Sequence, residues 1–165
     1  MRAFLDWAGS EHGCCQKDGG YLAGLSQGGE AFVVGKYDVP TGGCDTIHDV
    51  KALYETIYNL QSTHNHVLFE GLFVMNMTRG PQLAEELGKN LVLLQLTTPL
   101  ATCIASINSR RAEKGKGLLE NKANTQDNYR RATNYCAKMR DAGARVIKVS
   151  REEGLGKILE LLGEK

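Results

Sequence analysis

Short apolar runs alternate with helical patterns along most of this chain, and this alternation limits its possible folds more than any other feature. Apolar runs at 31–34 (AFVV), 66–69, 91–96 (LVLLQL) and 145–149 are each followed by a segment in which apolar residues recur at helical spacing. Strands separated by helices in this way predict an α/β fold with a mostly parallel sheet. The run at 91–96 is apolar on both faces, so we expect it to form a central, parallel strand.

Capping patterns predict where several helices begin. Thr46 with Asp49, and Ser150 with Glu153, fit the capping box, in which a hydroxyl and an acid three residues later satisfy free backbone N–H groups. Thr98, with a proline next to it, predicts the start of another helix. Further helices are expected at 2–8, 80–88 and 124–141. The glycine-rich segment 10–30 is expected to be a loop with one short strand near 21–25.

The composition is that of one domain without a strong charge. The chain has 165 residues and a formal net charge of +1, so no overall charge excess points to nucleic acid or anionic lipid, although a local patch remains open. The first residues lack the apolar run of a signal peptide, and no apolar stretch is long enough to cross a membrane. Five cysteines without a CxxC pair indicate reduced thiols. We therefore expect a single cytoplasmic domain over residues 1–165, with no membrane and no evident protein partner.

Glu70 ends the apolar run in the stretch VLFEG, at residues 67–71. An acid at the carboxyl end of a parallel strand lies in the crevice where α/β sheets bind ligands. A carboxylate there can hold magnesium, directly or through water, and so align a triphosphate. The alternative is a strand-end acid that caps a nearby turn.

A second candidate is the stretch TGGCDTI, at residues 41–47. Gly42 and Gly43 let the backbone approach a substrate closely. Asp45 lies just before a helix and after a loop that follows a strand, where an acid could accept a proton from a substrate hydroxyl. The alternative is that Asp45 is only a helix N-cap.

A third candidate is the stretch SRRAEKGKG, which begins at Ser109. Arg110, Arg111 and Lys114 follow a helix and end in glycines, which suits a segment that closes over phosphates and neutralises their charge. The alternative is a solvated helix end, whose dipole favours cations. Arg79, at the start of a helix, either contacts a substrate phosphate or is simply exposed.

The motif that would cradle the phosphates is absent from the 165 residues. A phosphate loop requires G-x-x-x-x-G-K-[ST] between a strand and a helix. The chain contains four Gly-Lys pairs, and none of them is followed by Ser or Thr or preceded by a glycine at the required position.

Taken in order, four stretches nevertheless resemble the P-loop kinases of the adenylate-kinase-like type, and within them the phage 5-hydroxymethyluracil DNA kinases. They are VVGKYDVPTGGCDTI, VLFEGLFV, LTTPLATCIASINSRRAEKGKG and NYRRATNYCAKMRDAGARVIKV, and the resemblance covers about residues 20–165. It implies transfer of phosphate from ATP, with magnesium, to the hydroxymethyl group of a modified DNA base.

The resemblance also implies roles for the candidate residues. Glu70 matches the acid on the magnesium side, and Asp45 matches the acid on the substrate side. Arg110, Arg111 and Lys114 match the lid, at about residues 109–123, that contacts the phosphates of ATP.

The family's first strand and phosphate loop have no counterpart in this chain. The resemblance therefore implies a three-layer P-loop kinase-like fold without its first central strand, which would lie between the strand ending at Glu70 and 91–96. We expect the chain as given to bind Mg-ATP poorly, and the coding sequence upstream of Met1 to continue in frame into an apolar strand and a phosphate loop. A non-catalytic remnant of a kinase and a kinase of small metabolites remain open as alternatives.

Overall fold

The computed structural model describes residues 1–38 and 42–164 and has a mixed α/β fold, as the sequence predicts. The described chain divides into two compact units. One unit contains residues 1–79 and the C-terminal segment from Leu155, and the other contains Gly80–Gly154. None of the described helices has both the length and the apolar character needed to cross a membrane.

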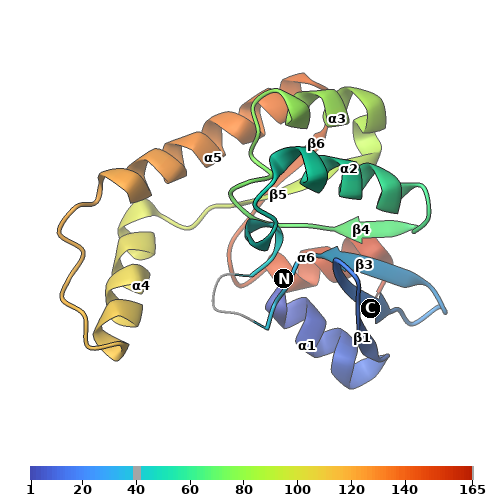
Figure 1. Cartoon of the computed structure of the whole chain (residues 1–165), viewed down its shortest axis with the longest axis horizontal. Coiled ribbons are helices and arrows are strands. Elements are labelled where there is room, and N and C mark those ends of the chain that lie inside the picture. Colours follow the sequence, from blue (N-terminus) through green and yellow to red (C-terminus); the bar gives the residue numbers. More distant parts are fainter. Residues whose placement is uncertain (39–41, 165) are drawn as a thin grey trace. The chain divides into compact units, whose positions relative to one another are not determined.

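The first unit is built on a four-stranded sheet with the order β1-β2-β3-β4 (Figure 1). Its strands are β1 (Cys14–Lys17), β2 (Gly20–Gly24), β3 (Glu30–Val34) and β4 (His66–Leu68). β1 with β2 and β2 with β3 are antiparallel, whereas β3 and β4 are parallel, with Val33 opposite Leu68. The predicted parallel arrangement is therefore wrong for two of the three strand pairs of this unit.

The antiparallel part arises from a hairpin in the glycine-rich segment. Lys17 pairs with Gly20, which leaves only Asp18 and Gly19 in the loop between β1 and β2. Asp-Gly between two short strands is among the strongest hairpin signals in a sequence. The prediction of a loop with a single strand is wrong here because the Asp-Gly turn pairs the glycine-rich segment into a hairpin.

Helices of the first unit surround a small apolar core. They are α1 (Arg2–Glu11), α2 (Val50–Gln61) and α6 (Gly154–Leu162), with the short 3-10 turn η1 (Cys44–Thr46). Phe4 and Ala8 of α1 are buried against Ala31 and Val33 of β3, and the apolar side of α6 packs on the same cluster. Burial of these side chains supplies most of the stabilisation of this unit.

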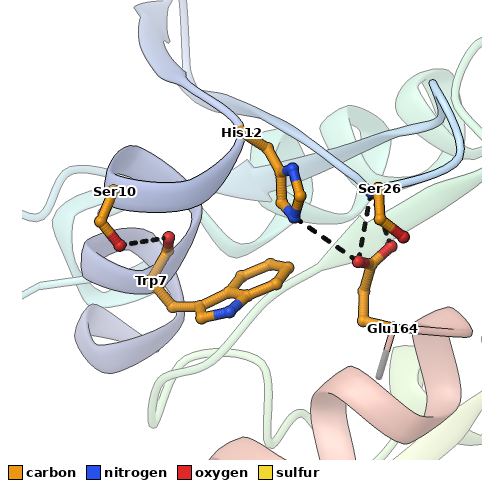
Figure 2. A network of polar contacts seen from close by, with 5 residues as sticks. All are labelled: Trp7, Ser10, His12, Ser26 and Glu164. Carbon is orange, nitrogen blue, oxygen red and sulfur yellow. Dashed lines mark hydrogen bonds and ion pairs between the residues drawn. The ribbon is translucent and has the colours of Figure 1, made fainter.

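A polar network joins the C-terminal segment of the first unit to the N-terminal part of the same unit (Figure 2). Both carboxylate oxygens of Glu164 accept the backbone N–H of Ser26, at 3.0 and 3.2 Å. Nε2 of His12 lies 3.7 Å from the same carboxylate, and the His12 ring meets the edge of Trp7. Glu164 is thereby buried with partners, which is the usual condition for a carboxylate inside a protein.

The second unit contains the other two strands and three helices. They are α3 (Arg79–Leu87, whose first residue belongs to the first unit), η2 (Gly88–Asn90), β5 (Val92–Leu96), α4 (Leu100–Glu113), α5 (Ala123–Asp141) and β6 (Arg145–Val149). β5 and β6 form a parallel pair, as predicted, with Leu94 opposite Ile147. Among the described residues β5 pairs with β6 alone, and its central position stays a prediction. An apolar strand is stable only when other elements shield its side chains from water, and α5 packs on both strands of this pair.

Two of the three predicted helix starts differ from the structure. Asp49 is itself the N-cap of α2 and accepts hydrogen bonds from the N–H groups of Lys51 and Ala52, whereas Thr46 lies in η1. α4 begins after Pro99, without a side-chain cap from Thr98. An acid directly before a helix outcompetes a hydroxyl three residues earlier because its oxygen reaches two free N–H groups at once.

The third predicted helix start is confirmed. The Ser150 backbone N–H donates to Glu153 Oε2 at 2.8 Å, and the Glu153 N–H donates to the Ser150 hydroxyl at 3.2 Å. This reciprocal pair is the capping box that the sequence predicts before α6.

Candidate active site

The structure brings Asp45 and Glu70 together in the first unit. Asp45 lies in η1, which follows β3, and Glu70 lies two residues after the end of β4. Because β3 and β4 are parallel neighbours, the segments that follow them leave the sheet at the same edge. The backbone N–H of Cys44 donates to the Glu70 carbonyl at 2.8 Å and joins the two segments directly.

Two glycines make this close approach possible. Gly43 has φ +71°, and a Cβ atom there would lie 2.8 Å from the Glu70 carbonyl oxygen and 3.0 Å from the Tyr37 hydroxyl. Gly71 has φ +143°, and a Cβ atom there would lie 2.6 Å from Oδ1 of Asp45. Both positions therefore exclude a side chain on grounds of backbone conformation and space. A substrate contact for Gly42 and Gly43 stays a prediction, and Thr41 of the same motif lies outside the described residues.

Asp45 has one engaged and one available carboxylate oxygen. Oδ1 accepts the backbone N–H of Phe73 at 3.0 Å, which fixes the orientation of the carboxylate. Oδ2 accepts no hydrogen bond from the part of the chain that the structure describes. Because Asp49 caps α2, the alternative role of Asp45 as the N-cap of that helix is wrong. A half-buried carboxylate with one fixed and one open oxygen is suited to accept a proton from a bound hydroxyl.

Glu70 is the second acid of the candidate site. Its side chain is 48% exposed, and Oε2 lies 3.6 Å from the Met1 amino nitrogen. No three acidic, histidine or cysteine side chains gather into a metal-binding group anywhere in residues 1–38 and 42–164. Mg²⁺ does not require such a group, because it commonly uses one or two carboxylates together with water and substrate phosphates. The hard carboxylate oxygens of Glu70 fit that ligand chemistry.

Tyr37 and Cys44 complete the surroundings of Glu70, although the sequence did not single them out. Burial raises the pKa of the Tyr37 hydroxyl above its usual range, and the negative charge of Glu70 raises it further. This hydroxyl is buried without a hydrogen-bond partner among the described residues. Burial likewise raises the pKa of the Cys44 thiol to about 12. Both groups are protonated at neutral pH, so Cys44 is not a nucleophile there.

The predicted lid residues lie at the end of α4 in the second unit. Arg110 Nε donates to the Ser106 carbonyl at 3.3 Å, within the helix. Arg111 Nε donates to the Gly117 carbonyl at 2.7 Å and so holds the segment after α4 against the end of that helix. Arg110 and Lys114 are exposed. Contact of Arg110, Arg111 or Lys114 with phosphate stays a prediction.

Arg79 and His64 have local roles in the structure. The Arg79 N–H donates to Oδ1 of Asn76 at 2.9 Å, at the start of α3, and its contact with a substrate phosphate stays a prediction. His64 packs its ring against Phe32, at 5.1 Å between centroids, and its Nδ1 lies 2.9 Å from the Thr63 hydroxyl. These contacts give His64 a structural role.

Comparison with known proteins relates this chain to a phage protein. No family model matches it, and no solved structure matches it. It is 30% identical over 133 residues to a 5-hmdU DNA kinase of Pseudomonas phage PaMx11, and the match covers 79% of this chain and 69% of that relative. The prediction of a relationship to this phage group is thereby confirmed. The chain belongs to the family of the phage 5-hmdU DNA kinase.

Proposed function

We propose that this protein acts in the ATP-dependent transfer of a phosphoryl group to a hydroxyl of a modified base in DNA, in a P-loop kinase-like fold. One observation carries the proposal: the segments with Asp45 and Glu70 meet at the edge where the parallel strands β3 and β4 end. The hydrogen bond from the Cys44 backbone N–H to the Glu70 carbonyl joins them. The membership of the chain in a DNA kinase family supports a base in DNA as the acceptor.

In this proposal Asp45 is the general base. Its Oδ2 takes the proton of the acceptor hydroxyl while the hydroxyl oxygen forms a bond to the γ-phosphorus of ATP. The bond from that phosphorus to the oxygen bridging to the β-phosphate breaks, and ADP leaves with the electron pair. The hydrogen bond from Phe73 to Oδ1 keeps Oδ2 directed at the acceptor.

Glu70 and the basic residues handle the charge of the phosphates. When bound, Mg²⁺ would neutralise charge on the phosphate oxygens, and Glu70 would be the carboxylate of this chain that holds it. Arg110, Arg111 and Lys114 carry the positive charge that a closing lid needs. Gly42, Gly43 and Arg79 are proposed to contact the acceptor.

A non-catalytic relative of the kinase is the second candidate, and one observation favours it. The 165 residues contain no G-x-x-x-x-G-K-[ST] motif, so the backbone cradle and the lysine that hold ATP phosphates in P-loop proteins are missing from them. A protein of this kind would bind the acceptor without phosphorylating it. A kinase of small metabolites would instead phosphorylate a free nucleoside as readily as a base in DNA.

Substitution of Asp45 tests the catalytic proposal. Asp45→Asn keeps an acceptor for the Phe73 N–H but removes the general base, so transfer to an oligonucleotide carrying 5-hydroxymethyluracil should fall by about 10²-fold or more. The rate is measured with radiolabelled ATP, magnesium and an excess of protein over DNA, so that slow transfer is still detected.

Asp49→Asn is the matched control. It makes the same change of charge four residues away, and asparagine caps a helix as well as aspartate does, so transfer should stay within about two-fold of the unmodified protein. Equal transfer by the Asp45→Asn protein and the unmodified protein would reduce Asp45 to a structural residue.

A further inference from the structure

The segment that follows Glu70 exposes large apolar side chains beside the candidate site. Leu72, Phe73 and Met77 have 43%, 38% and 37% of their surface exposed. Single exposed apolar residues are ordinary, whereas contiguous exposed apolar surface is typical of binding sites. Half of the large apolar residues exposed in the described chain lie in this segment, which runs from residue 71 to 78.

The segment is anchored rather than loose. Val74 and Met75 are buried, and the Tyr54 hydroxyl of α2 donates to the Val74 carbonyl at 2.7 Å. The Phe73 backbone is tied to Asp45 through its N–H. Because the backbone of Phe73 and of its neighbour Val74 is held by these bonds, the fold sets where the Phe73 side chain leaves the backbone.

Phe73 lies in an aromatic pair with His48. The two ring centroids are 6.5 Å apart and the rings are nearly perpendicular, at 89°. His48 is exposed and lies between η1 and α2, only three residues after Asp45. An edge-to-face pair covers one face of only one of the two rings, and a partly exposed aromatic pair near a carboxylate is suited to a flat, polar, aromatic ligand.

We propose that Phe73 and His48 form a stacking surface for the acceptor base, taken out of the DNA stack and placed with its hydroxyl at Asp45. The proposal rests on the proposed function, and it adds the residues that hold the base. Enzymes that modify a base must act on a single strand or extrude the base from the duplex, because its reacting atoms are otherwise inaccessible. Stacking on aromatic side chains is the usual way to hold an unstacked base, and it tolerates different bases.

Binding of oligonucleotides tests the stacking surface without requiring transfer of phosphate. Two fluorescent single strands are compared, one with 5-hydroxymethyluracil at its centre and one with an abasic site there. The unmodified protein should bind the first strand about five-fold more tightly or better, because stacking of one base contributes that much. Phe73→Ala should bring the affinity for the two strands to within about two-fold of each other.

Leu72→Ala is the matched control, because Leu72 is the exposed neighbour of Phe73 and has no aromatic face. It should keep the preference for the strand with the base. His48→Ala should weaken that preference in part, and it serves as the second variant if circular dichroism shows that Phe73→Ala does not fold.

Several results would overturn the stacking surface. They are equal binding of the two strands by the unmodified protein, no binding of either strand, and an unchanged preference in both Phe73→Ala and His48→Ala. Sedimentation that shows a dimer abolished by Phe73→Ala would instead assign the surface to a second copy of the chain.

The outcome is separable from that of the proposed function. A base preference that depends on Phe73, together with no transfer of phosphate, would retain the stacking surface and reject the kinase proposal. Transfer that depends on Asp45, with the same KM and kcat in Phe73→Ala, would retain the kinase proposal and reject the stacking surface.

Discussion

The position of the Asp45 carboxylate depends on neighbouring residues that take no part in the proposed reaction. Its carboxylate is held by the Phe73 N–H and lies against Gly71, where a Cβ atom would come within 2.6 Å of Oδ1. The sequence indicates Asp45 and Glu70 as candidates, because their positions after apolar strands are visible in it. It could not predict Tyr37, Cys44 or Phe73, because their roles follow from which loops meet at the edge of the sheet.

Gly71→Ala should therefore impair the site through Asp45. The new methyl group would displace the carboxylate, and the backbone at φ +143° would be strained. We expect transfer of phosphate to fall by about 10²-fold and the free energy of unfolding to fall by about 1–3 kcal/mol. Both are measurable, by the transfer assay and by urea denaturation.

Gly156→Ala provides the comparison, because nothing lies within 4 Å of a Cβ atom at that position in α6. This variant should be unchanged in transfer and at least as stable as the unmodified protein, since alanine favours helix over glycine. Normal transfer of phosphate by the Gly71→Ala protein would show that transfer does not depend on the position of the Asp45 carboxylate.

The buried Cys44 thiol should make stability depend on pH in the alkaline range. Its pKa is raised by burial from 9.0 to about 12, so the folded state holds a proton that the unfolded chain loses. This contribution is fully present below pH 9.0 and is lost as the pH rises toward about 12. In that window the free energy of unfolding should fall on the order of 1 kcal/mol per pH unit from this group.

Urea denaturation at several pH values measures this dependence. Cys44→Ala lacks the thiol, so its stability should fall less steeply with pH than that of the unmodified protein. Parallel pH profiles of the two proteins would show that the thiol is not held protonated by the fold.

At the scale of elements, the sequence predicts the presence of helices and strands better than their ends. The same spacing of hydroxyl and acid makes a capping box at Ser150 and Glu153 but not at Thr46 and Asp49. The difference is local: Thr46 uses its hydroxyl on the turn of η1, where it donates to the Gly43 carbonyl at 2.7 Å. A spacing alone does not say which of two competing backbone partners a side chain takes.

The N-cap of α2 gives a prediction at this scale. Asp49→Ala removes the acceptor of two backbone N–H groups and should lower the free energy of unfolding by about 1 kcal/mol. Thermal or urea denaturation measures the change, and Asp49→Asn should lose only a few tenths of that amount. An unchanged free energy of unfolding in Asp49→Ala would contradict the assignment of Asp49 as the N-cap of α2. An equal loss in Thr46→Ala and Asp49→Ala, with no loss in Asp49→Asn, would not tell Thr46 from Asp49 as the cap.

At the scale of the whole molecule, the sequence predicts the fold class but not the division of the strands. The described strands form a four-stranded sheet in one unit and a two-stranded sheet in the other. β4 pairs with β3 alone and β5 with β6 alone within the described chain. Strand pairing joins residues distant in sequence, so apolar patterns identify strands without identifying their neighbours. A single kinase domain and a strand between β4 and β5 stay predictions.

The most direct test of the central claim is the transfer of phosphate to a single base in DNA. The protein, in excess, is incubated with millimolar Mg-ATP and one of two oligonucleotides, which carry 5-hydroxymethyluracil or thymine at the same position, and the products are weighed by mass spectrometry. The account predicts one added phosphate on the first oligonucleotide, none on the second, and none on either after magnesium is removed with EDTA. Absence of phosphate on the first oligonucleotide, or equal phosphate on both, would contradict it.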